Sequence, residues 1–256
     1  MPVRKTTFQV FVVSILLVFG LKPAVSEENY PPVAVVELFT SEGCSSCPPA
    51  DRLLSDLTRT SRSTEPQIFT LGFHVDYWND LGWPDRFSSP EFTNRQRVYA
   101  KTRGTYQVYT PQMVINGIDE FGGYRKDMAE KSIKKFLLEP AAAQIQLALK
   151  TSAPEKTLEI EFDLDGSWET AILNLALVER ELVNQVSRGE NKGKALKHEN
   201  VVRTFESVSV QQRKGKIQLT IPEGLVVSNA SVIAYLQDPK TLKVIGASRQ
   251  DLVTKK

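Results

Sequence analysis

The sequence predicts an α/β domain over residues 31–139, followed by an all-β, sandwich-like unit over residues 141–256. Two observations lead to this prediction. In the first part, β-branched runs alternate with segments whose apolar residues recur at helical spacing, which is typical of parallel strands joined by helices. In the second part, apolar and polar residues alternate along three segments, and with four further strand candidates they give about seven strands at the spacing of a β-sandwich.

The first part opens with a strand, a helix and a second strand. Residues 33–39 form a continuous β-branched run between prolines and a polar turn, which indicates a buried strand. Residues 50–59 carry leucines on one face and predict a helix, whose regular part is expected to begin near Pro48. Residues 67–75 are the next strand. This order implies a right-handed crossover and parallel pairing of the two strands.

An inserted helix and a hairpin complete the first part. The helix is expected over residues 88–103, because Ser88 and Glu91 fit a capping box. The dipeptide Asn116-Gly117 between two apolar runs predicts a tight hairpin. A closing helix is expected over residues 125–138. The second part has strand candidates at residues 145–149, 158–164, 171–178, 201–208, 217–221, 230–237 and 243–248.

Residues 1–26 have the layout of a secretory signal peptide. Two basic residues precede an apolar core that is too short to span a bilayer, and small residues follow at the expected cleavage point. We expect a periplasmic or secreted protein that makes no membrane contact once this segment is cleaved. An uncleaved N-terminal anchor is the alternative.

The charge balance argues against a nucleic-acid partner. Cleavage would remove three of the 32 basic residues and leave the chain close to neutral against its 30 acidic residues. The sequence also has no basic stripe with interleaved aromatic residues. The loop over residues 189–194 lacks the spacing of a phosphate-binding loop. We expect no cofactor.

Both cysteines of the chain lie in one motif, Cys44-Ser45-Ser46-Cys47, between the first strand and the first helix. As a structural crosslink the motif would close only four residues, for which chain entropy gives roughly 2 kcal/mol at most. Redox exchange or metal binding explains the motif better. For exchange, Cys44 at the helix N-terminus is the expected nucleophile, and Cys47 is the thiol that resolves the mixed disulfide.

The order strand, CxxC, helix, strand, helix, Thr-Pro, hairpin, helix resembles the thioredoxin fold over residues 33–138. Within it, residues 37–44, 74–78 and 109–113 are similar to a bacterial exported family known as domain of unknown function 1223. In thioredoxins a cis-proline after a β-branched residue faces the CxxC. The resemblance therefore implies that Thr110 and Pro111 shape a groove that holds a partner's backbone.

The resemblance also implies a role for Glu37, on the strand before the motif. Thioredoxins keep a buried acid near this position, and it relays a proton to the resolving cysteine. Glu37 would take that role if it is buried beside Cys47, because burial raises the pKa of a carboxyl group. A solvated or capping role is the alternative, since an alternating strand can equally direct Glu37 outward.

The sequence thus predicts an exported thiol-disulfide oxidoreductase whose partners are protein thiols or disulfides. The alternative is a non-enzymatic binding protein. One form of it is a carrier of copper or another metal, with Cys44, Cys47 and His74 as ligands. The other form is an interaction module with an inert disulfide. Near Asp76, His74 can also be a hydrogen-bonded structural residue.

Two further segments are candidates to cover the motif. The aromatic residues Trp78, Trp83 and Phe87 would form a roof over it, or they only pack within the insert. The loop over residues 189–194 would reach across the motif as a lid, or it is a mobile surface loop.

Overall fold

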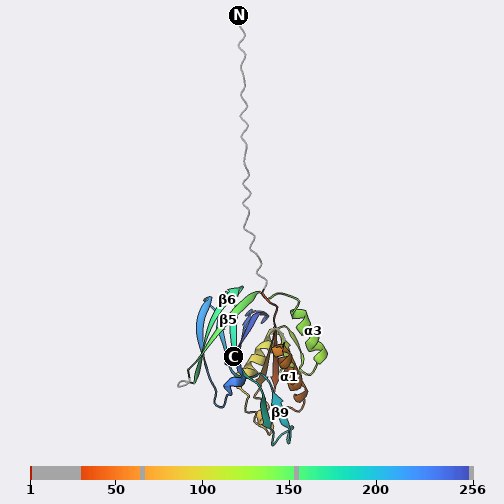
Figure 1. The fold of residues 1–256 in the computed structure, drawn as a ribbon. Helices are drawn as coiled ribbons and strands as arrows, with labels where there is room; N and C mark the ends of the chain where they lie inside the picture. The colour runs from red at the N-terminus through yellow and green to blue at the C-terminus, as the bar shows by residue number, and fades with distance from the viewer. Residues whose placement is uncertain (2–29, 64–66, 153–155, 254–256) are drawn as a thin grey trace.

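The computed structural model describes Met1 and residues 30–63, 67–152 and 156–253 (Figure 1). Apart from Met1, the predicted signal peptide lies outside the described residues. The part of the chain that is described forms three α-helices and thirteen strands. Within this part, no helix combines the length and the apolar character that a membrane crossing requires.

The predicted elements of the first part are present. The parallel strands β1 (Ala34–Thr40) and β2 (Ile68–His74) flank α1 (Pro48–Ser63), which begins at Pro48 as expected. The remaining elements are α2 (Pro90–Thr102), β3 (Gln112–Ile115), β4 (Asp119–Gly122) and α3 (Lys126–Phe136), with a short 3-10 helix, η1 (Asn79–Leu81), before α2.

One detail of the first part differs from the prediction. Ser89, and not Ser88, is the N-cap of α2, and its hydroxyl accepts from the backbone N–H of Glu91 at 3.2 Å. Pro90 is therefore the first helical residue, where the missing N–H of a proline has no consequence.

The second part consists mainly of strands, and each of the seven predicted strand candidates coincides with one of them. β8 and β9 were not predicted, because each has only four residues and pairs only within its own hairpin. The elements are β5 (Ala143–Ser152), β6 (Thr157–Gly166), β7 (Ile172–Glu179), β8 (Leu182–Gln185), β9 (Ala195–His198), β10 (Val201–Ser209), β11 (Lys214–Thr220), η2 (Val227–Asn229), β12 (Ala230–Gln237) and β13 (Val244–Asp251).

The predicted fold class, a thioredoxin-like α/β domain followed by a sandwich-like all-β unit, is wrong. A mixed eight-stranded sheet with the order β13-β12-β7-β10-β2-β1-β3-β4 runs through both parts of the chain. The two parts join where Val201 of β10 pairs with Gly72 of β2, and the Gly72 N–H donates to Asn200 O at 2.9 Å. Periodicity reveals which face of a strand is buried but not which strand lies beside it, so this junction was missed.

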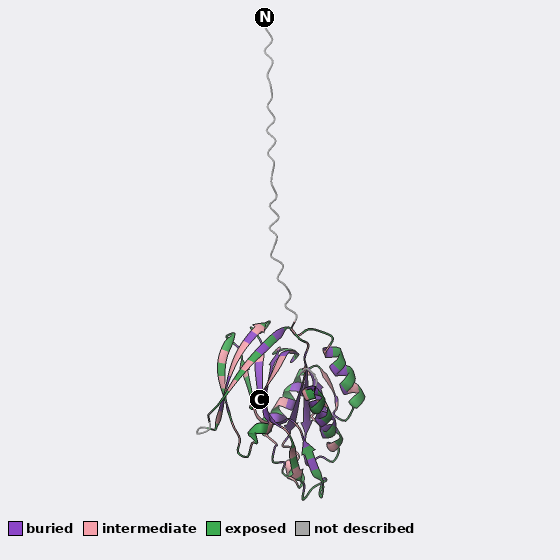
Figure 2. Ribbon diagram, viewed as in Figure 1, coloured by how far each residue is buried: buried purple, intermediate pink, exposed green. Residues whose placement is uncertain are grey.

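The hydrophobic core is also continuous across the two parts. One cluster joins β1, β2 and α2 to β7 and β12, and includes Phe39, Phe73, Tyr99 and Tyr235. A second cluster lies under α1 and α3, and a third lies between the large sheet and the three-stranded sheet β11-β6-β5. Figure 2 shows the buried residues where the strands meet the inner helix faces. The β8–β9 hairpin, residues 182–198, projects at one end near α1 (Figure 1).

Candidate functional site

The CxxC motif forms the turn between β1 and the first turn of α1. Cys44 and Cys47 are joined by a disulfide, with their Cα atoms 5.4 Å apart. The carbonyl oxygen of Cys47 accepts the N–H groups of Ala50 and Asp51 at 2.9 and 3.1 Å, which starts the helix at the motif. Both cysteines have 0% exposure, although Ser45 and Ser46 between them are exposed. The peptide turn therefore faces solvent while the disulfide is covered.

Trp78 connects the motif to the Thr110-Pro111 segment. Its indole N–H donates to Thr110 Oγ1 at 2.8 Å. Its Cβ lies 3.2 Å from the position that a Cβ on Gly43 would take, so only glycine fits here without a shift. Trp78 thus contacts the residue before Cys44 and the residue before Pro111. The predicted roof includes this residue.

The predicted cis peptide bond between Thr110 and Pro111 is present. The N–H of Gly123 donates to Pro111 O at 2.9 Å. A Cβ on Gly123 would lie 3.2 Å from Pro111 Cβ and 3.1 Å from Ala50 Cβ. Pro111 therefore packs next to the first turn of α1, which the motif begins.

Glu37 does not lie beside Cys47. Its carboxylate accepts from Arg95 of α2 at 2.7 and 2.8 Å and from the Tyr99 hydroxyl at 2.8 Å. α2 packs on the face of β1 that carries Phe39, whereas α1 packs on the opposite face. The proton-relay role is corrected on this ground, because successive strand residues face opposite sides. The solvated alternative does not hold either, since the Glu37 side chain is only 1% exposed.

His74 is paired with a carboxylate. Its Nδ1 lies 2.6 Å from Asp85 Oδ2, and both side chains are buried. Burial lowers the pKa of His74, but the Asp85 carboxylate outweighs burial and raises that pKa overall. Burial raises the pKa of Asp85, but His74 and the hydrogen bonds to its carboxylate lower that pKa overall. Across the described ranges, no three His, Cys, Asp or Glu side chains form a group suited to a metal ion. Cys44, Cys47 and His74 therefore do not form the copper or other metal site given as an alternative from the sequence.

A cluster of buried ionisable residues beside the motif was not predicted. It contains both histidines of the chain, whose rings lie 4.8 Å apart. His198 Nε2 lies 3.3 Å from Glu42 Oε1 without hydrogen-bond alignment, and neither atom has another partner. Burial raises the pKa of Asp51, which accepts from Thr40 Oγ1 at 2.8 Å. The members are Glu42, Asp51, His74, Asp85 and His198. The sequence separates these residues widely, and only the fold brings them together.

The loop of the β8–β9 hairpin lies against the motif, as one interpretation of residues 189–194 expected. Asn191 Nδ2 donates to the carbonyl oxygens of Glu42 and Cys44 at 2.8 and 2.9 Å. Glu190 Oε2 accepts the backbone N–H of Ser45 at 3.1 Å. Sequence analysis gave no role to the side chain of Glu42, yet the Nδ2 of Asn184 donates to its Oε2 at 2.8 Å.

The other two aromatic residues of the predicted roof belong to the same surroundings. The indole N–H of Trp83 donates to Glu42 Oε2 at 2.8 Å. The ring of Phe87 packs against His74 and His198, with centroid distances of 5.4 and 6.1 Å. These contacts place Trp83 and Phe87 around the buried ionisable cluster.

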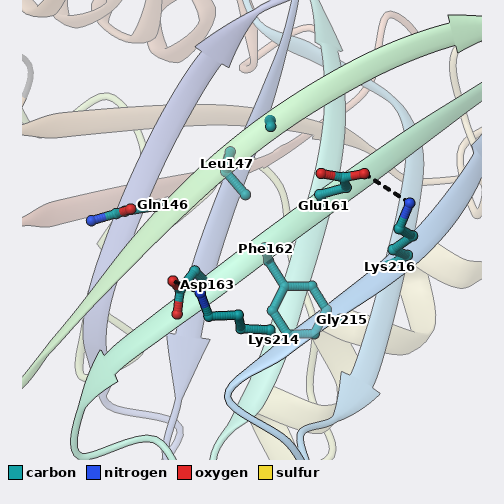
Figure 3. A pocket seen from close by; sticks show the side chains of 9 residues that line it. Gln146, Leu147, Glu161, Phe162, Asp163, Lys214, Gly215 and Lys216 are labelled. Atoms are coloured by element: carbon teal, nitrogen blue, oxygen red, sulfur yellow. Dashed lines mark ion pairs between the residues drawn. The ribbon is translucent and has the colours of Figure 1, made fainter.

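A separate hollow of about 450 Å³ lies on the three-stranded sheet, and no residue of the motif lines it (Figure 3). The charged residues around it pair with one another: Lys216 Nζ lies 2.8 Å from Glu161, and Lys214 Nζ lies 2.9 Å from Asp163. Phe162 extends across Gly215, where an added Cβ would lie 2.5 Å from the ring. This hollow offers no unpaired charged group for chemistry.

One solved structure is similar to this chain over most of its length. A protein of Agrobacterium tumefaciens with a known crystal structure is 27% identical, with a TM-score of 0.66, and the match covers 88% of this chain and 97% of that one. A domain of the outer membrane lipoprotein Omp28 from Porphyromonas gingivalis is 12% identical, with a TM-score of 0.28, and the match covers 43% of this chain and 86% of that one. No curated protein matches. The family model of the proteins of unknown function called DUF1223 matches residues 35–237, and the chain therefore belongs to the DUF1223 family.

Proposed function

We propose that the protein is an exported thiol-disulfide oxidoreductase and that its reactive group is the Cys44–Cys47 pair. The observation that supports this proposal most is the disulfide itself, placed at the N-terminus of the sixteen-residue helix α1. A ring of four residues stabilises a fold of this size very little, so a structural role explains it poorly. Unpaired N–H groups and the dipole at a helix N-terminus stabilise a thiolate, as exchange requires.

The two cysteines take unequal roles. In the reducing direction, the Cys44 thiolate attacks a partner disulfide, one partner sulfur leaves as a thiolate and takes up a proton, and a mixed disulfide forms. The Cys47 thiolate then attacks the Cys44 sulfur, the second partner sulfur leaves, and the Cys44–Cys47 disulfide is the oxidised product. The reverse sequence oxidises a partner dithiol. Ser46 supports this assignment, because its exposed hydroxyl lies 3.3 Å from Cys44 Sγ.

Trp78, Thr110 and Pro111 complete the proposed site. Trp78 contacts Gly43 on one side and hydrogen-bonds Thr110 on the other. Through these contacts it holds the segment before Pro111 next to the motif, where a partner chain would lie. The signal-like pattern of residues 1–26 supports the proposed export, and the N-terminal mass of the secreted or periplasmic protein tests cleavage after residue 26.

Trapping of partners tests the assignment of the two cysteines. The Cys47→Ser variant, expressed with its own N-terminal segment, should accumulate covalent partner adducts, because nothing resolves the mixed disulfide. The Cys44→Ser variant should trap far fewer partners. Adducts are read on non-reducing gels after acid quenching and alkylation, and they should vanish on adding reductant. The variant with both substitutions is the matched control and should form none.

The results separate the possible answers. Strong trapping by Cys47→Ser alone supports both the function and the roles. Equal trapping by the two single variants would remove the role assignment. No trapping by either variant, together with an unreactive Cys44 in the reduced wild type, would overturn the oxidoreductase proposal.

The second candidate function is an interaction module with an inert disulfide. The specific observation in its favour is the complete burial of both cysteines. In this case the exposed Ser45-Ser46 turn would be part of a contact surface, and the disulfide would only fix its shape. The absence of trapping described above is the result expected of this candidate.

A further inference from the structure

We infer that the β8–β9 hairpin is a cap over the Cys44–Cys47 disulfide and that it must lift before either sulfur reacts. This inference rests on the proposed function, because it concerns access to the same site. Its starting point is a contrast within four residues. Ser45 and Ser46 are exposed, whereas both cysteines have 0% exposure. Exchange needs a partner sulfur in line with the disulfide, so this burial has to be relieved.

Asn191 is the main contact between the cap and the motif. Its side chain is fully buried, and its Nδ2 donates to Glu42 O and Cys44 O at 2.8 and 2.9 Å. Lys194 Nζ donates to Asn191 Oδ1 at 2.9 Å, which fixes the orientation of the amide. Each proton of the amide therefore satisfies one carbonyl oxygen on either side of Gly43.

The contacts of the cap involve the backbone that a partner would need. The Glu190 carboxylate accepts the backbone N–H of Ser45, and the Asn191 amide donates to the carbonyl oxygens of Glu42 and Cys44. An extended partner segment beside Cys44 would use the same groups, since a bound chain is held by backbone hydrogen bonds. A protein partner therefore has to compete with residues 190 and 191 for the motif.

The hairpin is built so that it can open separately from the rest of the fold. In the part of the chain that is described, β8 and β9 form a sheet of two strands that neither joins the large sheet nor extends the three-stranded one. Two-stranded hairpins are marginally stable alone. We therefore expect this segment to open locally at a lower free energy than global unfolding, although opening also breaks the Asn184–Glu42 hydrogen bond and exposes His198.

The test measures how fast dithiothreitol reduces the disulfide in the oxidised full-length protein, followed by acid quenching, alkylation and mass spectrometry. The rate should equal the reactivity of an open disulfide multiplied by the open fraction. Asn191→Ala removes both hydrogen bonds to the motif, along with the one from Lys194, and should accelerate reduction roughly 10- to 100-fold. Asn191→Asp should accelerate it further, because a carboxylate of the same size presents no proton to the two carbonyl oxygens. Lys192→Ala, in the same loop, is the matched control and should stay within about twofold.

A second measurement keeps the inference testable if Asn191→Asp does not fold. The reduction rate of the wild type should rise only slightly with urea, because lifting a hairpin exposes little surface, whereas global unfolding exposes much. The inference is overturned if both Asn191 variants react at the wild-type rate, or if the wild-type rate rises with urea as steeply as global unfolding.

These rates are independent of the partner-trapping result. The absence of trapping by both single cysteine variants, together with an unreactive Cys44 in the reduced wild type, would overturn the proposed function and leave the reduction rates as expected for a cap. Unchanged rates in the Asn191 variants would overturn the cap and leave the trapping result intact.

Discussion

Replacing Glu37 with glutamine should lower the stability of the fold and leave the chemistry of the disulfide unchanged. The Glu37 carboxylate and the Arg95 guanidinium are buried together, with exposures of 1% and 12%. Glutamine keeps the size of the side chain but removes the negative charge, and it directs an NH₂ group toward a donor. Removing one partner of a buried ion pair costs about 3–5 kcal/mol, because the other charge stays buried without compensation.

The size of the effect makes it easy to measure. In a protein of this length about 1 kcal/mol shifts the melting temperature by about 2–4 °C, so Glu37→Gln should melt roughly 6–20 °C lower. Urea unfolding of the oxidised protein at neutral pH gives the free energy of unfolding, and thermal unfolding gives the melting temperature. The double variant Glu37→Gln/Arg95→Met should lose less stability than Glu37→Gln and Arg95→Met lose in sum, because the double variant leaves no unpaired charge. Asp127→Asn removes an exposed pair with Arg125 and is the control that should not change the melting temperature.

Redox measurements on Glu37→Gln test whether Glu37 acts on Cys47, as the sequence predicted, or only on Arg95, as in the structure. Because Glu37 lies on the face of β1 opposite α1, reduction of the disulfide by dithiothreitol in folded protein should occur at the wild-type rate. The reasoning is refuted if the variant keeps its stability. It is also refuted if resolution by Cys47 slows while the fold is intact, since Glu37 would then act on the thiol.

Two further predictions concern the fold around the site. Gly104 and Gly117 have nearly the same positive φ, 73° and 72°, but a Cβ on Gly117 would overlap a backbone oxygen at 1.8 Å, whereas a Cβ on Gly104 would meet open space. In urea unfolding, Gly104→Ala should therefore cost about 1–2 kcal/mol and Gly117→Ala about 2–5 kcal/mol. Equal losses of stability in the two variants would contradict the overlap at Gly117. The pKa of His74 is raised from its ordinary 6.5, so its contribution to stability should be complete below about pH 6.5 and be lost as the pH rises through the folded-state pKa. The pKa of Asp85 is lowered, so its contribution should be present above pH 3.8 and be lost as the pH falls through the folded-state value. His74→Gln should flatten the loss of stability toward high pH, and a variant whose pH profile equals that of the wild type would show that this pair does not set it.

The sequence predicted best where the signal is local. The β-branched run of β1, the hairpin turn at Asn116-Gly117 and the start of α1 at Pro48 depend on residues that are neighbours in the chain, and all three are present. The disulfide within the CxxC motif is local in the same sense. These features follow from backbone preferences and spacing, which a single sequence displays directly.

The remaining features depend on contacts between distant segments. Both faces of β1 are buried, one under α1 and the other under α2. The alternation of residues along the strand does not tell which helix covers which face, so it could not place Glu37. The contact of Asn191 with the motif depends on where a hairpin of two four-residue strands is placed. The pairing of His198 with Glu42 depends on the same placement.

The junction between β2 and β10 limits how the chain can be divided. A fragment that ends after α3 would leave the β2 edge without its neighbour and would uncover Phe73 and Tyr99 on the side where Tyr235 packs. Open strand edges beside an apolar surface favour aggregation. We therefore expect residues 31–139 expressed alone to be insoluble, even though they contain every residue of the CxxC motif. Co-expression with residues 141–256 as a separate polypeptide should restore solubility, because the second fragment supplies the missing strand and the other half of the shared core.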